Sequence, residues 1–228
     1  MARRVLYLIN TIDYNPPTGD PHILYYDEDI IVANKAPGLL SVPGRGEDKK
    51  DCLLSRVSEK YPDALIVHRL DMPTSGIIVL ARSAQVHKQL SQQFQQRKIA
   101  KQYIAVVHGL MENQSGEIDL PLITDWPNRP KQKVDYDSGK PSLTHFKVLE
   151  LNKNESTTRV RLTPITGRSH QLRVHLLSIG HRIVGDELYG STDQLNKGYS
   201  RLLLHANKIE FTHPTTNEVI SFDCPCEF

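Results

Sequence analysis

Short β-rich runs, each closed by turn residues, recur along most of the sequence and restrict the architectures that the chain can form. Residues 23–26 and 30–33 flank an acidic turn, a pattern that predicts a β-hairpin. Residues 143–151 and 158–162 form a second pair of runs that are close enough in sequence to pair directly. Strands joined by short turns are antiparallel, and helical patterns lie between these pairs. The sequence therefore predicts an α+β fold with a mixed, mostly antiparallel sheet rather than a doubly wound parallel one.

Three stretches carry a helical pattern, and the clearest follows Ser83. Val86, Leu90 and Phe94 recur every four residues on one face there, and Ser83 can cap the first turn. The other helices are predicted over residues 51–61 and 167–179, and further strands over 65–67, 77–81, 103–107, 202–211 and 219–222. Residues 119–141 are rich in Pro, Asn, Asp and Gly, which predicts a long excursion with little regular structure. Loops of that length are usually functional.

The overall composition is that of a globular protein. The 228 residues are 39% hydrophobic and 24% charged, which suits one core and leaves too little chain for several independent domains. No apolar run approaches the ~20 residues of a membrane span. Residues 5–9 form too short a run for a signal-peptide core, and the three cysteines are an odd count. We therefore expect a single-domain, cytoplasmic protein with reduced cysteines and no membrane partner.

The net charge of +2 gives little support by itself for a polyanionic partner, so the distribution of basic residues matters more. Each basic group in the sequence is explained equally well as a phosphate contact or as a solvated face. The groups are Arg97, Lys98 and Lys101, then Arg129, Lys131 and Lys133, then Arg159, Arg161, Arg168 and Arg173.

Asp71 stands in a turn between two apolar runs, in the segment from His68 to Gly76. A carboxylate in such a turn can be held rigidly and still face a cleft. Aspartate is also frequent in turns because its side chain bonds the local backbone. The turn alone therefore does not give Asp71 a chemical role.

Arg173 strengthens the case for a site. At ~100° per residue on a helix, Arg173 falls between Leu176 and Leu177 on the apolar side. Buried arginine needs a hydrogen-bonded anion, so the pattern predicts a carboxylate partner for Arg173. Arg168, Gln171 and His175 fall on a separate stripe of the same helix, which we expect to face phosphates or water.

Other chemistries have weaker support. His170 and His175 point ~140° apart on a helix, which does not match the i, i+4 spacing of a zinc helix. Ser75 has no nucleophile-elbow or S-x-x-K context, and no glycine pattern for a nucleotide follows any predicted strand. We expect neither a metal nor a cofactor.

The segment His68-Arg69-Leu70-Asp71-x-x-Thr74-Ser75-Gly76 resembles the signature of the RluA-type pseudouridine synthases. Other motifs of that family are matched in order along nearly the whole chain. They are Asn34-Lys35-x-x-Gly38-Leu39, Lys101-x-Tyr103, and Thr166-Gly167-Arg168-x-His170-Gln171-Leu172-Arg173-x-His175. Ala36 departs from the proline usual in the family, and residues 1–12 resemble an extension outside the pattern. No S4-like domain precedes the match, so the resemblance implies one catalytic domain over residues 1–228.

The resemblance implies the family's catalytic fold, with helices and loops around a central cleft, and an enzyme that isomerises uridine to pseudouridine in RNA. Residues 39–44, 119–133 and 201–206 are similar to dual-specificity members, which implies stem-loops of large-subunit (23S) rRNA and tRNA anticodon arms as partners. The sequence does not fix which uridines are modified or whether both RNA classes are substrates.

By the same resemblance, Asp71 is the catalytic carboxylate, as a nucleophile on the sugar or as a base, and Arg173 keeps it ionised. Tyr103 stacks on the target base and passes a proton, or is simply a core tyrosine. Arg69 moves into the place of the flipped nucleotide, or forms a surface salt bridge. Further substrate-binding residues are His68, Thr74, Lys101, Arg129, Lys131, Lys133, Arg168, His170 and Gln171, and Lys98 joins the phosphate contacts.

Two other functions compete with this interpretation. A non-catalytic RNA-binding module on the same scaffold would not need Asp71. A hydrolytic nucleosidase or glycosylase would admit water to the sugar and release free uracil. The oligomeric state is not fixed by the sequence, and we expect a monomer.

Overall fold

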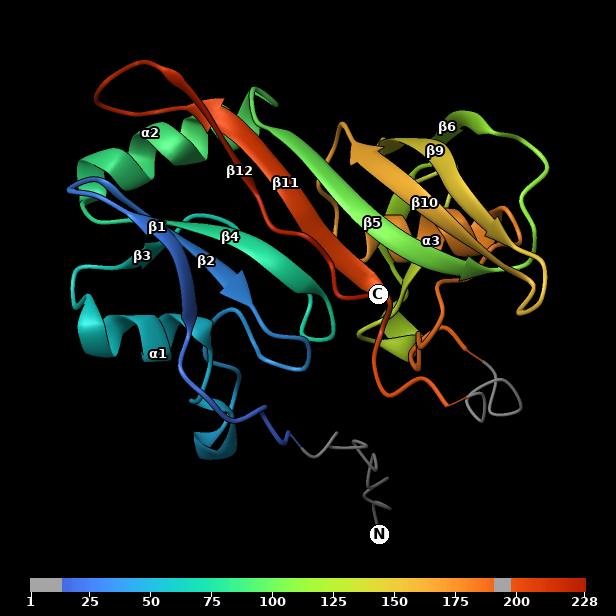
Figure 1. The fold of residues 1–228 in the computed structure, drawn as a ribbon, viewed down its shortest axis with the longest axis horizontal. Helices are drawn as coiled ribbons and strands as arrows, with labels where there is room; N and C mark the ends of the chain where they lie inside the picture. Colours follow the sequence, from blue (N-terminus) through green and yellow to red (C-terminus); the bar gives the residue numbers. More distant parts are fainter. Residues whose placement is uncertain (1–13, 191–197) are drawn as a thin grey trace, which may run out of the picture.

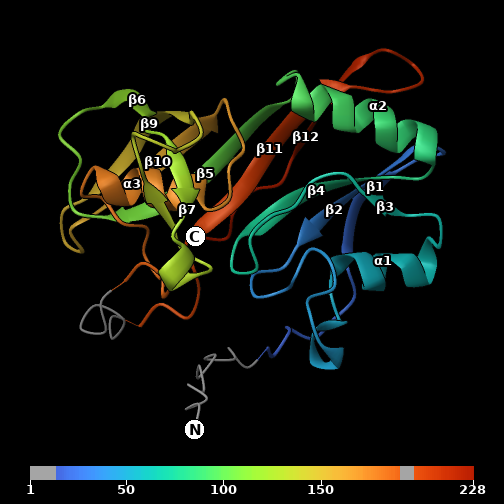
Figure 2. The same ribbon diagram turned by 180° about the vertical axis from the view of Figure 1, so that it is seen from behind.

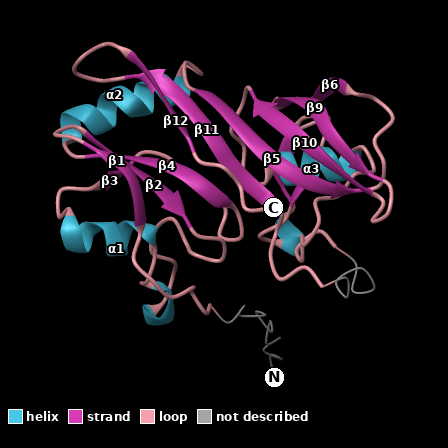
Figure 3. Ribbon diagram, viewed as in Figure 1, coloured by secondary structure: helices cyan, strands magenta, loops and turns pink. Residues whose placement is uncertain are grey.

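The computed structural model describes residues 14–190 and 198–228, so the predicted extension over residues 1–12 lies outside the described residues. One large sheet crosses the molecule, with helices at its periphery (Figures 1 and 3). Its strand order is β1-β2-β4-β11-β5-β10-β9-β6, with β3 paired to β4 and β12 to β11. All of these pairs are antiparallel except β4 with β11. The predicted α+β fold with a mixed, mostly antiparallel sheet is confirmed.

The first half of the sheet contains the hairpin expected around the acidic turn, and helices flank it. Its strands are β1 (His22–Tyr26), β2 (Ile30–Lys35), β3 (Leu65–Ile66) and β4 (Ser75–Ala81), and its helices are α1 (Leu53–Lys60) and α2 (Ala84–Gln95), with a 3-10 turn η1 (Glu47–Lys49). Ser83 caps α2 by accepting from the Val86 N–H, as its position predicts. Cys52 and Ser55 form a capping box at the start of α1.

The second half is built on β5, which lies between β10 and β11 in the sheet. Its elements are β5 (Ala100–His108), β6 (Ser115–Asp119), β9 (Leu143–Asn152), β10 (Thr157–Pro164), α3 (Gln171–Ser178), β11 (Leu204–Thr212) and β12 (Val219–Asp223). In Figure 2 α3 lies against the face of β9 and β10 that is turned away from the viewer of Figure 1. Leu172 and Leu176 join the core beneath it.

The excursion over residues 119–141 is more ordered than predicted. It contains a separate two-stranded antiparallel sheet of β7 (Leu122–Thr124) and β8 (Gln132–Val134), joined through the 3-10 turn η2 (Trp126–Asn128). We call residues 122–134 the β7–β8 hairpin. Its strands are three residues long, which is too short for a clear alternating pattern in the sequence. A residue outside the hairpin also contacts them, because the Gln132 N–H donates to the Tyr189 hydroxyl at 2.8 Å.

Helix α3 is shorter than the predicted helix over residues 167–179, because His170 precedes it in a left-handed conformation with φ 53°. Arg168 is therefore not on the helix, and the predicted polar stripe does not exist at the surface. His175 is fully buried and contacts the Thr144 hydroxyl and the Leu120 carbonyl. Polar partners on the neighbouring strand β9 and the chain before it satisfy the imidazole, which a helical projection does not reveal.

The two halves of the sheet meet at a short parallel junction between β4 and β11. Only two residue pairs form it, His205 with Ser75 and Ala206 with Gly76. Gly76 has φ +112°, and a Cβ there would lie 2.3 Å from the Ala206 carbonyl oxygen. Only glycine fits this approach. The junction therefore fixes the end of the Asp71 turn against β11, and a cleft of about 730 Å³ opens beside it.

Candidate active site

The turn that carries Asp71 lies at the wall of this cleft and is fastened on both sides. The Ser41 hydroxyl donates to the Leu70 carbonyl at 2.7 Å and accepts from the Leu70 N–H at 3.1 Å. The Thr74 N–H closes the turn on the Asp71 carbonyl at 3.1 Å. Asp71 keeps 27% of its side chain exposed, so the carboxylate is rigidly placed and still open to a ligand.

Lys35 supports the same turn from inside the protein. Its ammonium is fully buried and donates to the carbonyls of Ala36, Leu39 and Met72 at 2.7 to 2.9 Å. Burial lowers the pKa of Lys35 to about 7, and the nearby charge of Asp71 opposes that shift. The sequence shows Lys35 as part of a motif, whereas its three backbone contacts depend on the fold.

Arg173 lies beside Asp71, with its Nη1 atom 3.6 Å from the Asp71 Oδ2 atom. The required anion is present, but the closest one is Asp186, which the sequence analysis missed. Asp186 accepts from Arg173 Nε at 2.8 Å and from Nη2 at 2.7 Å. Burial opposes the charge of Arg173, but its pKa is raised overall by the hydrogen bonds and charge of Asp186 and by the charge of Asp71. One edge of the guanidinium is thus held by Asp186 while the remaining nitrogen faces the cleft.

Tyr103 comes from β5 and reaches the cleft between two core clusters. Burial, and then the charge of Asp71, raise the pKa of Tyr103. The hydroxyl therefore stays protonated at neutral pH, and the ring presents an apolar surface to a bound group.

His170 and Tyr189 complete the surroundings of Asp71. The His170 Nε2 atom lies 4.0 Å from the Asp71 Oδ1 atom, and its Nδ1 atom lies 2.8 Å from the Tyr189 hydroxyl. The Tyr189 ring lies 5.0 Å from the Arg173 guanidinium. Neither Tyr189 nor Asp186 was found from the sequence, because both lie in irregular chain after α3 where no periodic pattern marks them.

His68, Gln171 and Thr74 are predicted substrate-binding residues in the lining of the cleft, and their surroundings differ. His68 accepts the Val79 N–H at 3.0 Å, and burial followed by the charge of Lys101 lowers the pKa of His68 to about 3. Gln171 is buried and bonded to Thr166, Thr144, the Leu143 carbonyl and the Arg168 N–H. The buried Thr74 hydroxyl has no hydrogen-bond partner within the described residues.

The predicted basic contacts do not all lie in the cleft. Arg69, Lys101 and Arg168 line the cleft. Arg129, Lys131 and Lys133 belong to the β7–β8 hairpin, outside the lining, where Arg129 lies 4.3 Å from the Trp126 ring. Lys98 is also outside the lining, next to Arg97, which belongs to it. An RNA that reached both the cleft and the hairpin would cross the surface between them.

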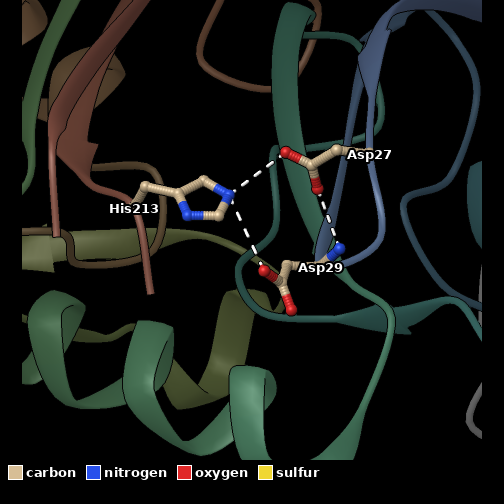
Figure 4. Close-up of side chains that lie close together, drawn as sticks. All are labelled: Asp27, Asp29 and His213. Atoms are coloured by element: carbon tan, nitrogen blue, oxygen red, sulfur yellow. Dashed lines mark hydrogen bonds and ion pairs between the residues drawn. The ribbon is translucent and has the colours of Figure 1, made fainter. Parts of the chain in front are cut away.

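A separate group of Asp27, Asp29 and His213 lies at the far edge of the first half and has the composition of a metal site (Figure 4). The His213 Nε2 atom is 3.1 Å from Asp27 and 4.0 Å from Asp29. Its Nδ1 atom accepts the N–H groups of Thr215 and Thr216. Both ring nitrogens are thus engaged, and the group ties the β11–β12 turn to the β1–β2 turn.

Comparison with known proteins identifies the class. The RNA pseudouridylate synthase family matches residues 29–178, which include Asp71, Tyr103 and Arg173. The chain belongs to this family and is an RNA pseudouridine synthase, an isomerase. Within the described residues no helix is long and apolar enough to cross a membrane.

Individual relatives are more specific. The dual-specificity RNA pseudouridine synthase RluA of Vibrio parahaemolyticus is 51% identical, covering 95% of this chain and 88% of that one. The enzyme of the same name from Escherichia coli is 50% identical, covering 95% and 98%. Among solved structures, human RNA pseudouridylate synthase domain containing 1 matches with a TM-score of 0.77 at 28% identity, covering 94% of this chain and 87% of that one.

Proposed function

We propose that this enzyme is dual-specific and isomerises uridines in stem-loops of large-subunit rRNA and of tRNA anticodon arms. Identity of about half over nearly the full length of relatives that carry the dual-specificity name supports this substrate range. The site assignment rests on the geometry at Asp71. This carboxylate is partly exposed, and its Oδ2 atom lies 3.6 Å from the buried guanidinium of Arg173.

Asp71 is the catalytic group in this proposal. The reaction breaks the bond between N1 of uracil and C1′ of the ribose, turns the retained uracil, and joins C5 to C1′. The C5 proton is then released and N1 gains a proton. Asp71 either attacks the sugar as a nucleophile or removes a sugar proton as a base, and both roles require it to be ionised. Arg173 places a positive charge 3.6 Å from the Asp71 carboxylate, and Asp186 holds Arg173 in that position.

The target uridine must leave its stack to reach Asp71, which costs a few kcal/mol in nucleic acids. Arg69 is exposed at the mouth of the cleft and takes the vacated position in the RNA. Lys101 and Arg168 at the cleft, with Arg129, Lys131 and Lys133 on the hairpin, bind phosphates, and Lys98 adds to them. His68, Thr74, His170 and Gln171 shape the pocket that receives the base and its sugar.

The catalytic domain itself selects the RNA in this proposal, because the cleft and the β7–β8 hairpin together present the basic residues. The enzyme acts in the cytoplasm as a monomer. Elution of the purified chain at the size of one 25.9 kDa copy, with and without a stem-loop RNA, checks the oligomeric state.

Replacing Tyr103 by phenylalanine separates its two proposed contributions. The ring that stacks on the base is kept, so RNA affinity should change less than about threefold, whereas loss of proton transfer should lower kcat by about 10²-fold or more. Single-turnover rates and binding measured on one stem-loop give both values. Equal kcat in wild type and variant would exclude proton transfer by the Tyr103 hydroxyl and leave the ring alone as its contribution.

The proposed substrate range is tested by incubating the enzyme with one rRNA stem-loop and one tRNA anticodon arm. Pseudouridine is derivatised with a carbodiimide, and the modified position is read as a reverse-transcriptase stop. We expect one new stop in each RNA and no free uracil. Modification of one RNA class alone would contradict dual specificity, and release of uracil would indicate a glycosylase instead.

A further inference from the structure

Tyr189 connects the β7–β8 hairpin with the surroundings of Asp71. Its hydroxyl lies 2.8 Å from the Gln132 nitrogen in β8 and 2.8 Å from the His170 Nδ1 atom. Tyr189 itself is anchored, because its own N–H donates to Asp186 at 3.2 Å. Two hydrogen bonds therefore lead from a strand of the hairpin to the imidazole that faces the candidate catalytic carboxylate.

The directions of these hydrogen bonds follow from the available protons. A backbone N–H can only donate, so the Tyr189 oxygen accepts from Gln132. Among the described residues, the only other hydrogen bond of this hydroxyl is to His170, and donation of the single phenolic proton to Nδ1 gives both groups a partner. An imidazole that accepts at Nδ1 and is neutral carries its proton on Nε2. That nitrogen is the one that lies 4.0 Å from Asp71.

The surroundings keep His170 neutral. Burial is the largest influence and lowers its pKa, the charges of Asp71 and Asp186 oppose that shift, and the charge of Arg173 adds to it. Asp71 faces the ring from the turn before β4, Arg173 from α3, and Asp186 and Tyr189 from the chain after α3.

The backbone of His170 also indicates a constraint at this point. A non-glycine residue with φ 53° is uncommon, and such residues gather at functional sites. The conformation places the imidazole beside the cleft at the start of α3 instead of along the helix.

We propose that Tyr189 is a positioning residue that holds His170 with its Nε2–H directed toward Asp71 and the ribose bound there, and so couples the β7–β8 hairpin to the reacting group. This inference rests on the proposed role of Asp71. RNA that contacts Lys131 or Lys133 touches the neighbours of Gln132 on either side. A shift of the hairpin is therefore transmitted to the reacting centre through Tyr189 and His170.

The first test replaces Tyr189 by phenylalanine and records kcat as a function of pH. A hydrogen bond donated to the neutral imidazole favours the neutral form, so its loss raises the pKa of His170. We expect kcat to fall about tenfold, the effect of roughly one hydrogen bond, and the acid limb of the profile to move to higher pH. An equal loss at every pH would indicate a purely structural residue and overturn the proposal.

Tyr199→Phe is the matched control, since it removes a tyrosine hydroxyl that bonds Glu155 at the surface at 2.8 Å. Its profile should match that of the wild type.

The second test is a double-mutant cycle with His170→Asn, because asparagine tolerates the left-handed backbone at this position. If Tyr189 acts through His170, the double variant should have the kcat of His170→Asn alone, and additive losses would overturn the coupling. If the double variant is too slow to measure, the pH profile of Tyr189→Phe alone tests the proposal. If Asp71→Asn stays active, the proposed role of Asp71 fails; if that variant is inactive while Tyr189→Phe loses activity equally at every pH, only this inference fails.

Discussion

Asp71→Asn is expected to lower pseudouridine formation by at least about 10⁴-fold, since it removes the charge and the basicity that either mechanism needs. Asparagine has nearly the same shape, and the turn is held by backbone contacts of Leu70, Met72 and Asp71 rather than by the carboxylate. The variant should therefore fold and bind RNA normally. Single-turnover assays on a stem-loop, with carbodiimide mapping as the readout, measure the loss.

Asp63→Asn is the matched control, because Asp63 is a half-exposed aspartate that forms a salt bridge with Arg82 at 3.0 Å, in the chain before β3. Its rate should equal that of the wild type. Normal turnover of Asp71→Asn would remove Asp71 from the chemistry and would mean that another group carries the reaction.

Asp186→Ala is expected to destabilise the protein by about 3–5 kcal/mol, the usual cost of removing one partner of a buried, hydrogen-bonded ion pair. Arg173 is 4% exposed, and the charge that remains near it is Asp71 at 3.6 Å. For a chain of this size, such a loss lowers the melting temperature by on the order of 10 °C. Thermal unfolding followed by calorimetry or circular dichroism gives the value.

An apolar double variant separates stability from catalysis. Arg173→Met together with Asp186→Leu removes both charges and keeps comparable volume, a change that often leaves stability unaltered. We expect it to recover most of the lost stability and to remain inactive, because Asp71 has lost its guanidinium. A melting temperature of Asp186→Ala equal to that of the wild type would show that Asp186 does not support Arg173, and activity in the double variant would show that Arg173 is dispensable.

Local patterns predicted the elements whose cause is local. The β1–β2 hairpin follows from two apolar runs around a turn, and α2 from its cap and apolar stripe. The predicted start of α3 was wrong because His170 adopts a left-handed backbone conformation, which helix propensities do not predict. The β7–β8 hairpin was missed because its short strands depend on contact with Tyr189, distant in sequence.

The site was predictable where a residue requires a particular chemical partner. A buried Arg173 requires an anion, and a family motif points to Asp71, which lies 3.6 Å away. This requirement does not identify which carboxylate forms the shortest hydrogen bonds with Arg173, so Asp186 was missed. Likewise the expected stripe of Gln171 and His175 lies inside the protein, because β9 and the chain before it supply partners that a helical projection cannot contain.

The position of β11 bears on how the chain matures during synthesis. This strand lies between β4 and β5, yet it begins at Leu204, well after β4 ends at Ala81 and β5 ends at His108. A nascent chain therefore carries two unjoined half-sheets, each with an open edge, until residues 204–212 have left the ribosome. Domains of such high contact order fold slowly, and open strand edges favour aggregation. Pairing of β11 with both half-sheets then completes the lining of the candidate cleft and buries both edges late in synthesis.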